Sequence, residues 1–356
     1  MTTWQKIHQH PALWEQYLLR ERVIRAIRQF FIGQKFREID PPLLITHPAA
    51  ESYLEVFQTT LYDHYRNSQP MFLSTSPETA LKKLLVAGIG NCFALTKSFR
   101  NMETGGPLHH PEFTMLEWYR AGVDYRETMQ DCEQLLLFIK RFISNKTRQK
   151  TATREIVYQG QTLDLTPPWE RLSVREAFKR YAQFDLAQAL TRPALHKLAK
   201  HRGYRVEQKT TWEELFNQIY LNEVEPRLGQ GKPTIIYDFP LELAALARKK
   251  AGDPRWAERF EFYLAGLELG DGYSELTDWK EQEKRFKREI TKIKRLGKTV
   301  YDYDHDFIEA LKVGLPECSG VAVGVDRLVM LFGNRKDIAE TLFFPIKETS
   351  ALRKDY

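Results

Sequence analysis

Two short stretches constrain the fold of this 356-residue chain most strongly, because each ends a strand-like run beside an arginine. The first combines Phe99–Asn101 with Phe113–Tyr119, which begins thirteen residues after Arg100. The second is Gly320–Arg327, where glycine and alanine alternate with valine before the arginine. Period-2 alternation is typical of strands, and a planar guanidinium matches a phosphate group. The pattern predicts strand ends at which a nucleotide binds, although a lone arginine at a strand end is more often a surface residue.

Strand-like and helix-like segments alternate irregularly along the chain. Apolar residues recur at helical spacing over residues 14–31, an extended, proline-limited segment follows at residues 36–42, and residues 121–250 are mostly helical in pattern. Strand runs interrupted by helices favour the α+β class, with an antiparallel sheet flanked by helices. Strands are expected at residues 71–73, 93–100, 113–120, 235–237 and 321–325, a hairpin at 259–269 and a last helix at 326–332.

The composition, with 42% hydrophobic and 28% charged residues, is that of a globular protein with a large core. Residues 1–6 lack the basic and apolar regions of a signal peptide, and no apolar run approaches the ~20 residues that span a bilayer. Cys92, Cys132 and Cys318 are odd in number and far apart, which argues against a disulfide framework and favours the reducing cytosol. The net charge of +6 suits an acidic macromolecular partner without identifying one.

Glu261 and Glu268 lie in the expected hairpin and suggest a metal site. If the hairpin turns at Leu264–Ala265, the two glutamates lie directly opposite each other, with Cβ atoms ~5 Å apart. Two carboxylates that close repel each other unless a cation lies between them, and Mg²⁺ prefers a few carboxylates together with phosphate oxygens and water. The spacing is consistent with a seat for Mg²⁺ and ATP, and equally consistent with two glutamates that face solvent.

The expected strand faces carry further candidates. Glu117 and Tyr119 share one face, which is unusual for a core and suits the floor of a site for an amine. Gly320, Ala322 and Gly324 leave one face of their strand almost bare. A bare face allows either the approach of a planar ligand or the tight packing of a helix.

The segment Thr75–Glu78 precedes a helical pattern and has the spacing of a capping box, with a proline near the first helical position. A cap is a sufficient structural reason for these residues. A helix N-terminus beside a carboxylate also forms a polar corner next to a sheet.

Together these features resemble the catalytic core of class II aminoacyl-tRNA synthetases, specifically the lysyl branch. Residues 99–119 are similar to motif 2 of that family, residues 320–327 to motif 3, and residues 14–42 to motif 1. The resemblance implies that the chain activates a carboxylate as an adenylate, with ATP and Mg²⁺. It covers nearly the whole chain and is also carried by residues 76–78, 233–234, 238–240, 260–278 and 307–311.

The resemblance further implies one catalytic domain over residues 1–356, with a helical insertion at roughly residues 125–230. The anticodon-binding OB-fold expected before this core is not seen, because the motif 1 pattern already occupies residues 14–42. The chain therefore resembles the truncated branch of the family, the ligases that attach (R)-β-lysine to a lysine of elongation factor P. Ala322 supports this branch, since lysyl-tRNA synthetases usually carry glycine there and the extra methyl group disfavours an α-amino group.

The implied partners are elongation factor P, lysine or β-lysine, and a second copy of the chain in a homodimer, whereas tRNA and a membrane are not expected. The implied location is the cytoplasm. Glu261 and Glu268 are implied as the Mg²⁺ ligands. The implied substrate-binding residues are Ser76, Pro77, Glu78, Glu117, Tyr119, Glu268, Glu275 and Ala322. The implied ATP-binding residues are Arg100, Asn101, Met102, Glu103, His110, Phe113, Glu261, Phe262, Gly324 and Arg327.

Three positions depart from the lysyl pattern. Met102 stands where motif 2 carries glutamate, and Glu103 takes over that role if the register shifts by one residue. His110 and Asp271 stand where asparagine is expected, and Asp271 adds a negative charge beside the substrate. Three functions stay open: a ligase acting on a protein lysine, a minimal enzyme that forms an amino-acid adenylate for tRNA or a free amine, and a non-catalytic paralogue that binds an amino acid. The retained arginines and glutamates weigh against the last.

Overall fold

The computed structural model describes residues 1–104, 106–146 and 154–349, and its centre is an eight-stranded sheet. Inner neighbours pair antiparallel, whereas the edge pairs β1–β5 and β9–β10 are parallel. The α+β class and the antiparallel sheet expected from the sequence are confirmed. In spatial order the strands are β1 (Arg37–Glu38), β5 (Cys92–Phe99), β6 (Glu112–Ala121), β13 (Cys318–Gly324), β12 (Leu267–Ser274), β11 (Trp256–Leu264), β10 (Thr234–Pro240) and β9 (Glu170–Ser173).

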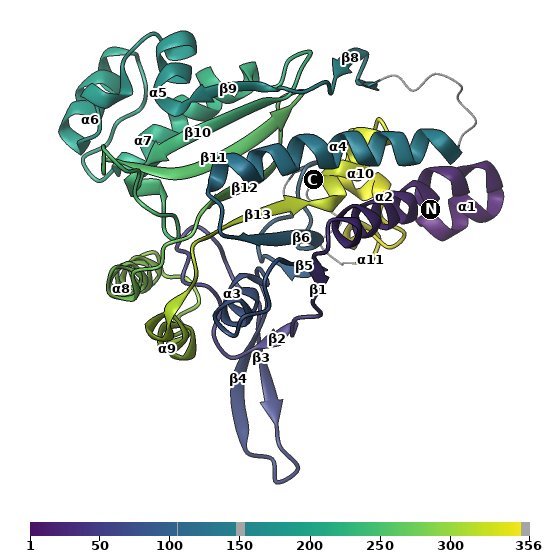
Figure 1. The fold of residues 1–356 in the computed structure, drawn as a ribbon, viewed down its shortest axis with the longest axis horizontal. Helices are drawn as coiled ribbons and strands as arrows, with labels where there is room; N and C mark the ends of the chain where they lie inside the picture. Colours follow the sequence, from purple (N-terminus) through teal and green to yellow (C-terminus); the bar gives the residue numbers. More distant parts are fainter. Residues whose placement is uncertain (105, 147–153, 350–356) are drawn as a thin grey trace.

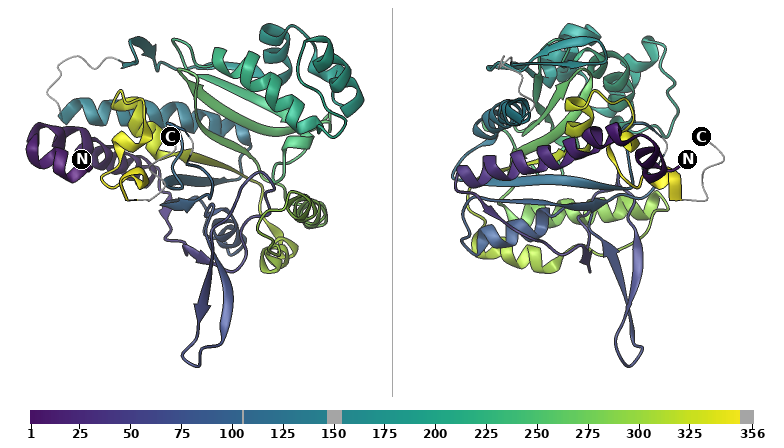
Figure 2. Two further views of the ribbon diagram at one scale, coloured as in Figure 1. Left: turned by 180° about the vertical axis from the view of Figure 1, so that it is seen from behind. Right: turned by 90° about the vertical axis from the view of Figure 1, so that its right-hand side faces the viewer.

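Helices cover both faces of this sheet (Figures 1 and 2). One face carries α2 (Trp14–Gly33), α4 (Tyr125–Lys146) and α10 (Val325–Phe332). The other face carries α3 (Glu78–Val86), which packs against α9 (His305–Gly314), and α9 packs in turn against α8 (Trp279–Arg295). The helices expected at residues 14–31 and 326–332 are both present, the first extended by two residues.

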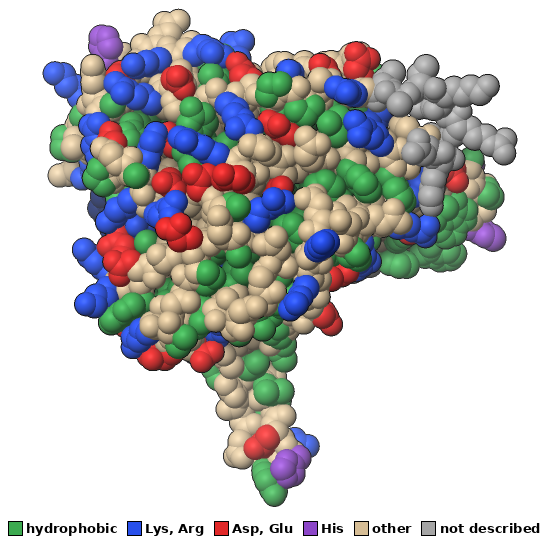
Figure 3. Space-filling model, viewed as in Figure 1, with side chains coloured by type: hydrophobic (Ala, Val, Ile, Leu, Met, Phe, Trp, Pro, Cys, Tyr) green, Lys and Arg blue, Asp and Glu red, His purple; other side chains and the backbone are tan. Residues whose placement is uncertain are grey.

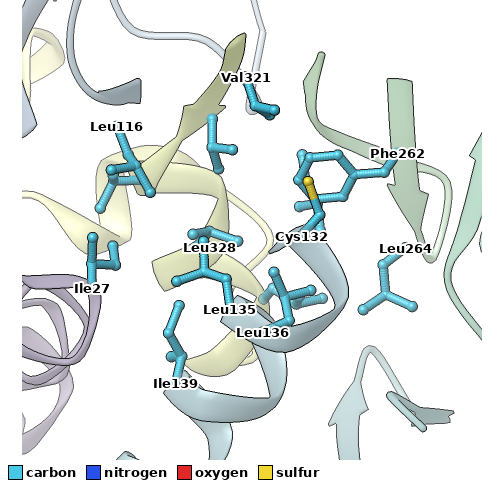
Figure 4. Close-up of a cluster of buried hydrophobic side chains, with 14 of the residues drawn as sticks. Ile27, Leu116, Cys132, Leu135, Leu136, Ile139, Phe262, Leu264, Val321 and Leu328 are labelled. Atoms are coloured by element: carbon cyan, nitrogen blue, oxygen red, sulfur yellow. The ribbon is translucent and has the colours of Figure 1, made fainter. Parts of the chain in front are cut away.

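The largest hydrophobic core lies between the sheet and the layer of α2, α4 and α10 (Figure 4). Helix α4 contributes Cys132, Leu135, Leu136 and Ile139, whose three- and four-residue spacing places them on one face of the helix, fully buried. Leu328 of α10 meets them there. Burial of each such aliphatic side chain contributes about 1.5–3 kcal/mol. This apolar layer holds the strands from one side, so the opposite face of the sheet is left for polar side chains.

The segment between α4 and β10 contains strands as well as helices. Its helices form a second core beside β10, in which Phe178 and Phe216 are buried. The expectation of mostly helical structure over residues 121–250 is therefore wrong for its short strands, whose four-residue patterns are too brief to stand out. The elements are β7 (Glu155–Tyr158), β8 (Gln161–Asp164), α5 (Val174–Ala177), α6 (Arg192–His201) and α7 (Trp212–Ile219), which continues in a π-helical turn at Tyr220–Val224.

A β-hairpin stands out from the body of the molecule (Figures 1 and 3). It consists of β3 (Gln58–Tyr62) and β4 (Ser68–Leu73), and β2 (Leu44–Ile45) pairs with β4 at its base. The terminal helices are α1 (Thr3–Gln9) and α11 (Ile346–Thr349). Over the described ranges, no helix combines the length and apolar character needed to cross a membrane.

The start of α3 differs from the expected capping box. Pro77 is the N-cap residue and no side chain caps the helix. Instead, the Glu78 amide donates to Ser76 Oγ over 3.1 Å, and the Glu78 carboxylate contacts Lys82 and Tyr273. The capping-box prediction for Thr75–Glu78 is therefore wrong, because the glutamate turns inward to partners that lie far away in the sequence or one turn further along the helix.

Candidate active site

A cavity of about 680 Å³ lies over the polar face of the sheet. Strands β6, β13, β12 and β11 form its floor, and α7, α8 and the segment at residues 51–53 contribute to its walls. Of the residues predicted for substrate, ATP or metal, eight line this cavity: Ser76, Glu78, Arg100, Glu117, Tyr119, Glu261, Glu268 and Ala322.

The floor is made of two adjacent rows of side chains that cross four strands in register. One row runs from β11 to β6 through Glu261, Asp271, Ala322 and Glu117, which pair in succession. The second row, two residues along each strand, consists of Arg259, Tyr273, Gly320 and Tyr119. All eight residues line the cavity. Alternation along each strand therefore brings residues from three distant parts of the sequence onto one surface.

Glu117 lies at one end of the first row and is almost completely buried. Its two carboxylate oxygens accept hydrogen bonds of 2.6 Å each from Ser76 Oγ and Tyr119 Oη. Burial, and next the charge of Glu78, raise the pKa of Glu117 to about 8, while the two hydrogen bonds oppose the shift. A buried carboxylate with a raised pKa favours an ammonium group as its partner, because a positive charge restores the ionised form.

Sequence reasoning missed Lys82, which lies beside this carboxylate. Its ammonium group contacts Glu78 Oε1 and Glu275 Oε2, and Tyr273 Oη donates to Glu78 Oε1 over 2.6 Å. Glu275 is buried beneath the cavity floor rather than lining it. The spacing of four residues between Glu78 and Lys82 on a helix is the sequence signal from which their contact could have been predicted.

Gly320 in the second row leaves room for two of these side chains. A Cβ atom at this position would overlap the ring of Tyr119 and lie 2.7 Å from Glu275 Oε1. The bare strand face was expected to allow either a ligand or the packing of a helix. At Gly320 it does not pack against a helix, because this residue lines the cavity. The absence of a side chain at Gly320 leaves the space that Tyr119 and Glu275 occupy.

Arg100 marks the other end of the cavity, at the end of β5. Its guanidinium lies 5.2 Å from the centroid of the Phe113 ring, which does not itself line the cavity. Glu103 Oε1 is 4.0 Å from Arg100 Nη1, whereas the Met102 side chain is 77% exposed. Glu103 therefore lies next to Arg100, and its role in place of the motif 2 glutamate stays a prediction. The Asn101 side chain accepts from the Met102 amide over 2.9 Å and stays outside the cavity lining.

Arg327 lies behind the cavity floor, where it connects motif 3 to the hairpin. Its Nη1 donates to the Glu268 carbonyl over 2.7 Å and lies 3.4 Å from Glu268 Oε2. Its Nη2 lies 3.0 Å from His109 Nε2, and burial together with the Arg327 charge lowers the pKa of His109. Neighbouring Gly324 leaves open space toward the Arg327 stem, since a Cβ there meets nothing closer than 3.9 Å.

The hairpin carries three carboxylates, but its register differs from the prediction. The turn lies at Ala265–Gly266, one residue later than predicted, so that Glu268 pairs with Tyr263. A bulge between Phe262 and Tyr263 then shifts the register further and places Glu261 opposite Asp271. The prediction that Glu261 and Glu268 lie directly opposite each other is therefore wrong, although both line the cavity. An inserted residue in one strand has no signature in the period-2 pattern.

Glu261 and Glu268 retain the chemistry of a magnesium seat. Glu261 accepts from Arg259 Nη2 over 2.7 Å and from Tyr263 Oη over 2.5 Å. Burial raises its pKa to about 8, with Arg259 opposing the shift and Glu268 adding to it. Carboxylates that repel each other in a cavity fit a hard cation that also takes phosphate oxygens. Within residues 1–104, 106–146 and 154–349, no group of three or more His, Cys, Asp or Glu side chains forms a protein-only metal site.

Two predicted nucleotide contacts lie elsewhere. The Phe262 ring is completely buried in the main core and packs 6.0 Å from Trp169, so its side chain cannot contact a ligand in the cavity. His110 Nδ1 lies 2.5 Å from the Glu112 carbonyl and its Nε2 accepts from the Ile346 amide over 2.9 Å. His110 therefore connects β6 to the C-terminal segment as a structural link. Pro77 serves as the N-cap of α3 and is also absent from the lining.

The fold and the cavity define a catalytic core of class II synthetase type, and the comparison with known families agrees. The chain belongs to the tRNA synthetases class II (D, K and N), which match residues 4–348. This is the family expected from motifs 1 to 3.

Among its relatives, the elongation factor P–(R)-β-lysine ligase of Avibacterium paragallinarum is 38% identical over 334 residues, or 93% of this chain and 95% of that protein. The ligase of the same description from Histophilus somni is 36% identical over 341 residues, or 95% of this chain and 97% of that protein. The lysine–tRNA ligase of Pelotomaculum thermopropionicum is 33% identical over 339 residues, which cover 95% of this chain but 64% of the relative.

Proposed function

We propose that this chain is a ligase that activates (R)-β-lysine with ATP and transfers the β-lysyl group to a lysine ε-amine of elongation factor P. The observation that carries the proposal is one cavity that joins a pocket of buried carboxylates to an arginine. Glu117 and Glu78 suit the ammonium groups of a diamino acid, and Arg100 suits a phosphate. The alignments with the two β-lysine ligases cover 93–97% of both this chain and the relative, which supports the choice of substrate and acceptor.

The reaction needs no side-chain nucleophile. The carboxylate of the amino acid attacks the α-phosphorus of ATP, diphosphate leaves, and the acyl-adenylate remains in the cavity. The acceptor amine then attacks the acyl carbon, loses a proton and releases AMP. Arg100 stabilises negative charge that develops on the phosphate, while Glu117 and Tyr119 hold the amine end so that the carboxylate faces the nucleotide. Mg²⁺, held by Glu261 and Glu268, would neutralise phosphate charge.

Ala322 supports β-lysine over α-lysine. It lies in the middle of the first floor row, between Asp271 on β12 and Glu117 on β6. Ala322 lines the cavity, and we place the carboxylate end of the amino acid beside its methyl group, where an α-amino group would be crowded. An amine moved one carbon further along the chain avoids this contact.

The experiment is ATP–diphosphate exchange with (R)-β-lysine, α-lysine and no amino acid, followed by the intact mass of elongation factor P after incubation. We expect exchange that favours β-lysine and one β-lysyl unit added to the factor. Exchange with α-lysine and no mass shift would favour the tRNA-type activity named for the Pelotomaculum relative. Absence of any exchange would favour a non-catalytic paralogue.

We also propose that residues 1–356 act as one catalytic domain in a cytosolic homodimer. The three buried free thiols, Cys92, Cys132 and Cys318, suit a reducing compartment. The family resemblance assigns the dimer contact to α2 and β1. Light scattering of the purified protein tests this assignment, with twice the chain mass as the expected result and the single-chain mass as the result that contradicts it.

A further inference from the structure

Lys82 is a charged side chain in the interior of the protein that the reaction described above does not use. It lies on α3 and is 1% exposed. Its ammonium group is enclosed by the rings of Tyr273, Tyr119 and Phe307, whose centroids lie 5.4, 5.9 and 6.0 Å away. Burial of a lysine without partners costs several kcal/mol. The position is therefore held by specific partners, of which Glu78 lines the cavity and Glu275 lies next to Gly320 of its floor.

The partners of Lys82 are two carboxylates of the amine pocket, Glu78 and Glu275. Although burial lowers the pKa of Lys82, the charges of Glu275 and Glu78 raise it above its usual value, so the side chain is an ammonium ion at neutral pH. With Glu117, the pocket holds three carboxylates and one resident cation. When all are ionised the net charge is −3 + 1 = −2.

One oxygen of this pocket has no partner. Lys82 contacts Glu275 Oε2, whereas Glu275 Oε1 is buried and has no hydrogen-bond partner among the described residues. That oxygen points toward Gly320, since a Cβ on this glycine would lie 2.7 Å from it. Gly320 lines the cavity. The free oxygen therefore lies next to Gly320 of the floor, where it is itself buried and adds negative charge to this end of the cavity.

We propose that Lys82 is a positioning residue, whose ammonium group fixes Glu78 and Glu275 and neutralises one of the three carboxylates. The pocket then keeps two uncompensated negative charges, which match a substrate with two ammonium groups. The inference rests on the proposed adenylation activity. It explains why three glutamates converge on one small volume: one ammonium is supplied by the protein and two by the diamino acid. A monoamine would leave one buried carboxylate uncompensated, which is costly in a site of low dielectric.

The acidic groups around Lys82 come from its own helix and from the neighbouring strands. Glu78 comes from its own helix, and the strands supply the remaining acidic groups. The titratable groups that face it are Glu78 on α3, Glu117 and Tyr119 on β6, Tyr273 on β12, Glu275, Cys92 on β5 and Cys318 on β13. Of these, Glu117 and Glu275 change charge between pH 5 and pH 9, because burial raises their pKa values to about 8, whereas burial raises the pKa values of Cys92 and Cys318 above this range.

The test compares Lys82→Met, Lys82→Arg and Lys83→Met in ATP–diphosphate exchange over a range of pH. Lys83 is the matched control, because it lies on the same helix but pairs with Asp304 and Asp306 near the surface. We expect Lys82→Met to raise the KM for (R)-β-lysine at least about tenfold, to leave the KM for ATP within about twofold, and to move the acidic limb of the pH profile upward. Lys82→Arg should recover most of the loss and Lys83→Met should match the wild type. An unchanged KM and pH profile, or a parallel loss of ATP and amino-acid binding, would overturn the proposal.

A second measurement on the wild type keeps the test independent of how the variants fold. Removing either amine of the substrate gives 6-aminohexanoate or 3-aminohexanoate. We expect each monoamine to require a concentration at least about a hundredfold higher than (R)-β-lysine for the same exchange rate. Use of either monoamine as efficiently as the diamino acid would overturn the charge match. ATP–diphosphate exchange with (R)-β-lysine in the same assay tests the proposed function separately, so that a failure of the Lys82 proposal can be distinguished from a failure of the proposed function.

Discussion

Glu261 on β11 lies directly opposite Asp271 on β12, because the hairpin turns at Ala265–Gly266 and a bulge after Phe262 shifts its register further. Arg259 connects the two carboxylates: its Nη2 is 2.7 Å from Glu261 Oε1 and its Nε is 3.9 Å from Asp271 Oδ2. The centre of the cavity floor is therefore an acidic pair held by one arginine. Glu268 lies outside this pair, opposite Tyr263, and its carboxylate is 3.4 Å from Arg327 Nη1.

Glu268→Ala should abolish adenylation without unfolding the protein. The Glu268 side chain is 40% exposed and its carboxylate lies 3.4 Å from Arg327, so its loss removes little packing. It removes one of the two carboxylates proposed for Mg²⁺. Diphosphate exchange and thermal unfolding measured on the same preparation check this prediction. Full exchange activity would remove the metal assignment, and a large fall in the unfolding temperature would mean that Glu268 has a structural role.

Asp271→Asn should improve use of the amino acid, by about threefold in KM, because a negative charge beside the substrate carboxylate is removed. Burial raises the pKa of Asp271 to about 6, while Arg259 opposes the shift. A carboxyl group with this pKa is neutral below pH 6 and ionised above it. The variant and the wild type should therefore converge below pH 6 and diverge above it.

The measurement is the KM for (R)-β-lysine from pH 5 to pH 8 in both proteins. A constant ratio across this range would contradict the electrostatic reason, because protonation of Asp271 would then have no effect. A higher KM in the variant would show that Asp271 binds a substrate amine, as an additional partner to the glutamates.

The amine pocket predicts a second pH dependence of the KM for (R)-β-lysine, in the direction opposite to that expected from Asp271. Burial raises the pKa values of Glu117 and Glu275 to about 8 in the free protein. The amines of the substrate keep their protons through this range, since amines of this type titrate near 10. Binding of a diammonium ligand requires the ionised carboxylates, so the KM for (R)-β-lysine should fall as the pH rises from 6 toward 8. Proton release on binding, measured in buffers of different ionisation enthalpy, should accompany it.

A KM that does not change between pH 6 and pH 8 would contradict this prediction. ATP is kept at a saturating concentration at each pH, because Glu261, which is proposed for Mg²⁺, has a pKa that burial raises to about 8 as well, whereas Arg100 keeps its charge.

The sequence predicts the floor of the site far better than its walls. Period-2 alternation placed Glu117 and Tyr119 on one face, and the structure confirms it because strands β5, β6 and β13 are regular and pair without a shift. The bulge in β11–β12 could not be predicted, since one extra residue leaves the hydrophobic pattern almost unchanged. The walls could not be predicted either, because α7 and the segment around Tyr53 reach the cavity through contacts between residues far apart in the sequence.

The predictions for several single residues differ from the structure, and each difference has a physical reason. His110 matched the nucleotide motif by position, but its two ring nitrogens are engaged by backbone groups. Phe262 follows a cavity residue directly, and alternation turns its ring into the core. Lys82 was overlooked because a lysine next to Lys83 on a helix has the pattern of a solvated face, and only the tertiary structure shows that Glu275 meets it.

Gly320→Ala should disrupt the amine pocket selectively. The new Cβ would overlap the Tyr119 ring and approach Glu275 Oε1 to 2.7 Å, so both side chains must move. We expect the KM for (R)-β-lysine to rise about ten- to a hundredfold with little change in the KM for ATP. Gly33→Ala is the matched control, because a Cβ there meets nothing within 4 Å. Equal effects of the two substitutions, or an unchanged KM in Gly320→Ala, would mean that the pocket relaxes around the methyl group.

Ala322→Gly tests what decides between the two isomers of lysine. Ala322 lies between the acidic pair and Glu117 on the floor, and its methyl group is the only side-chain atom that separates them on β13. Removing it widens the cavity next to the carboxylate-binding end, where an α-amino group needs room. We expect α-lysine to be used about tenfold better and (R)-β-lysine to be used about as well as before, because differences of one methyl group in a binding site are worth about 1–3 kcal/mol. Exchange rates with both isomers in the wild type and the variant give the ratio directly. If α-lysine adenylation does not change, the methyl group does not set the preference between the two isomers.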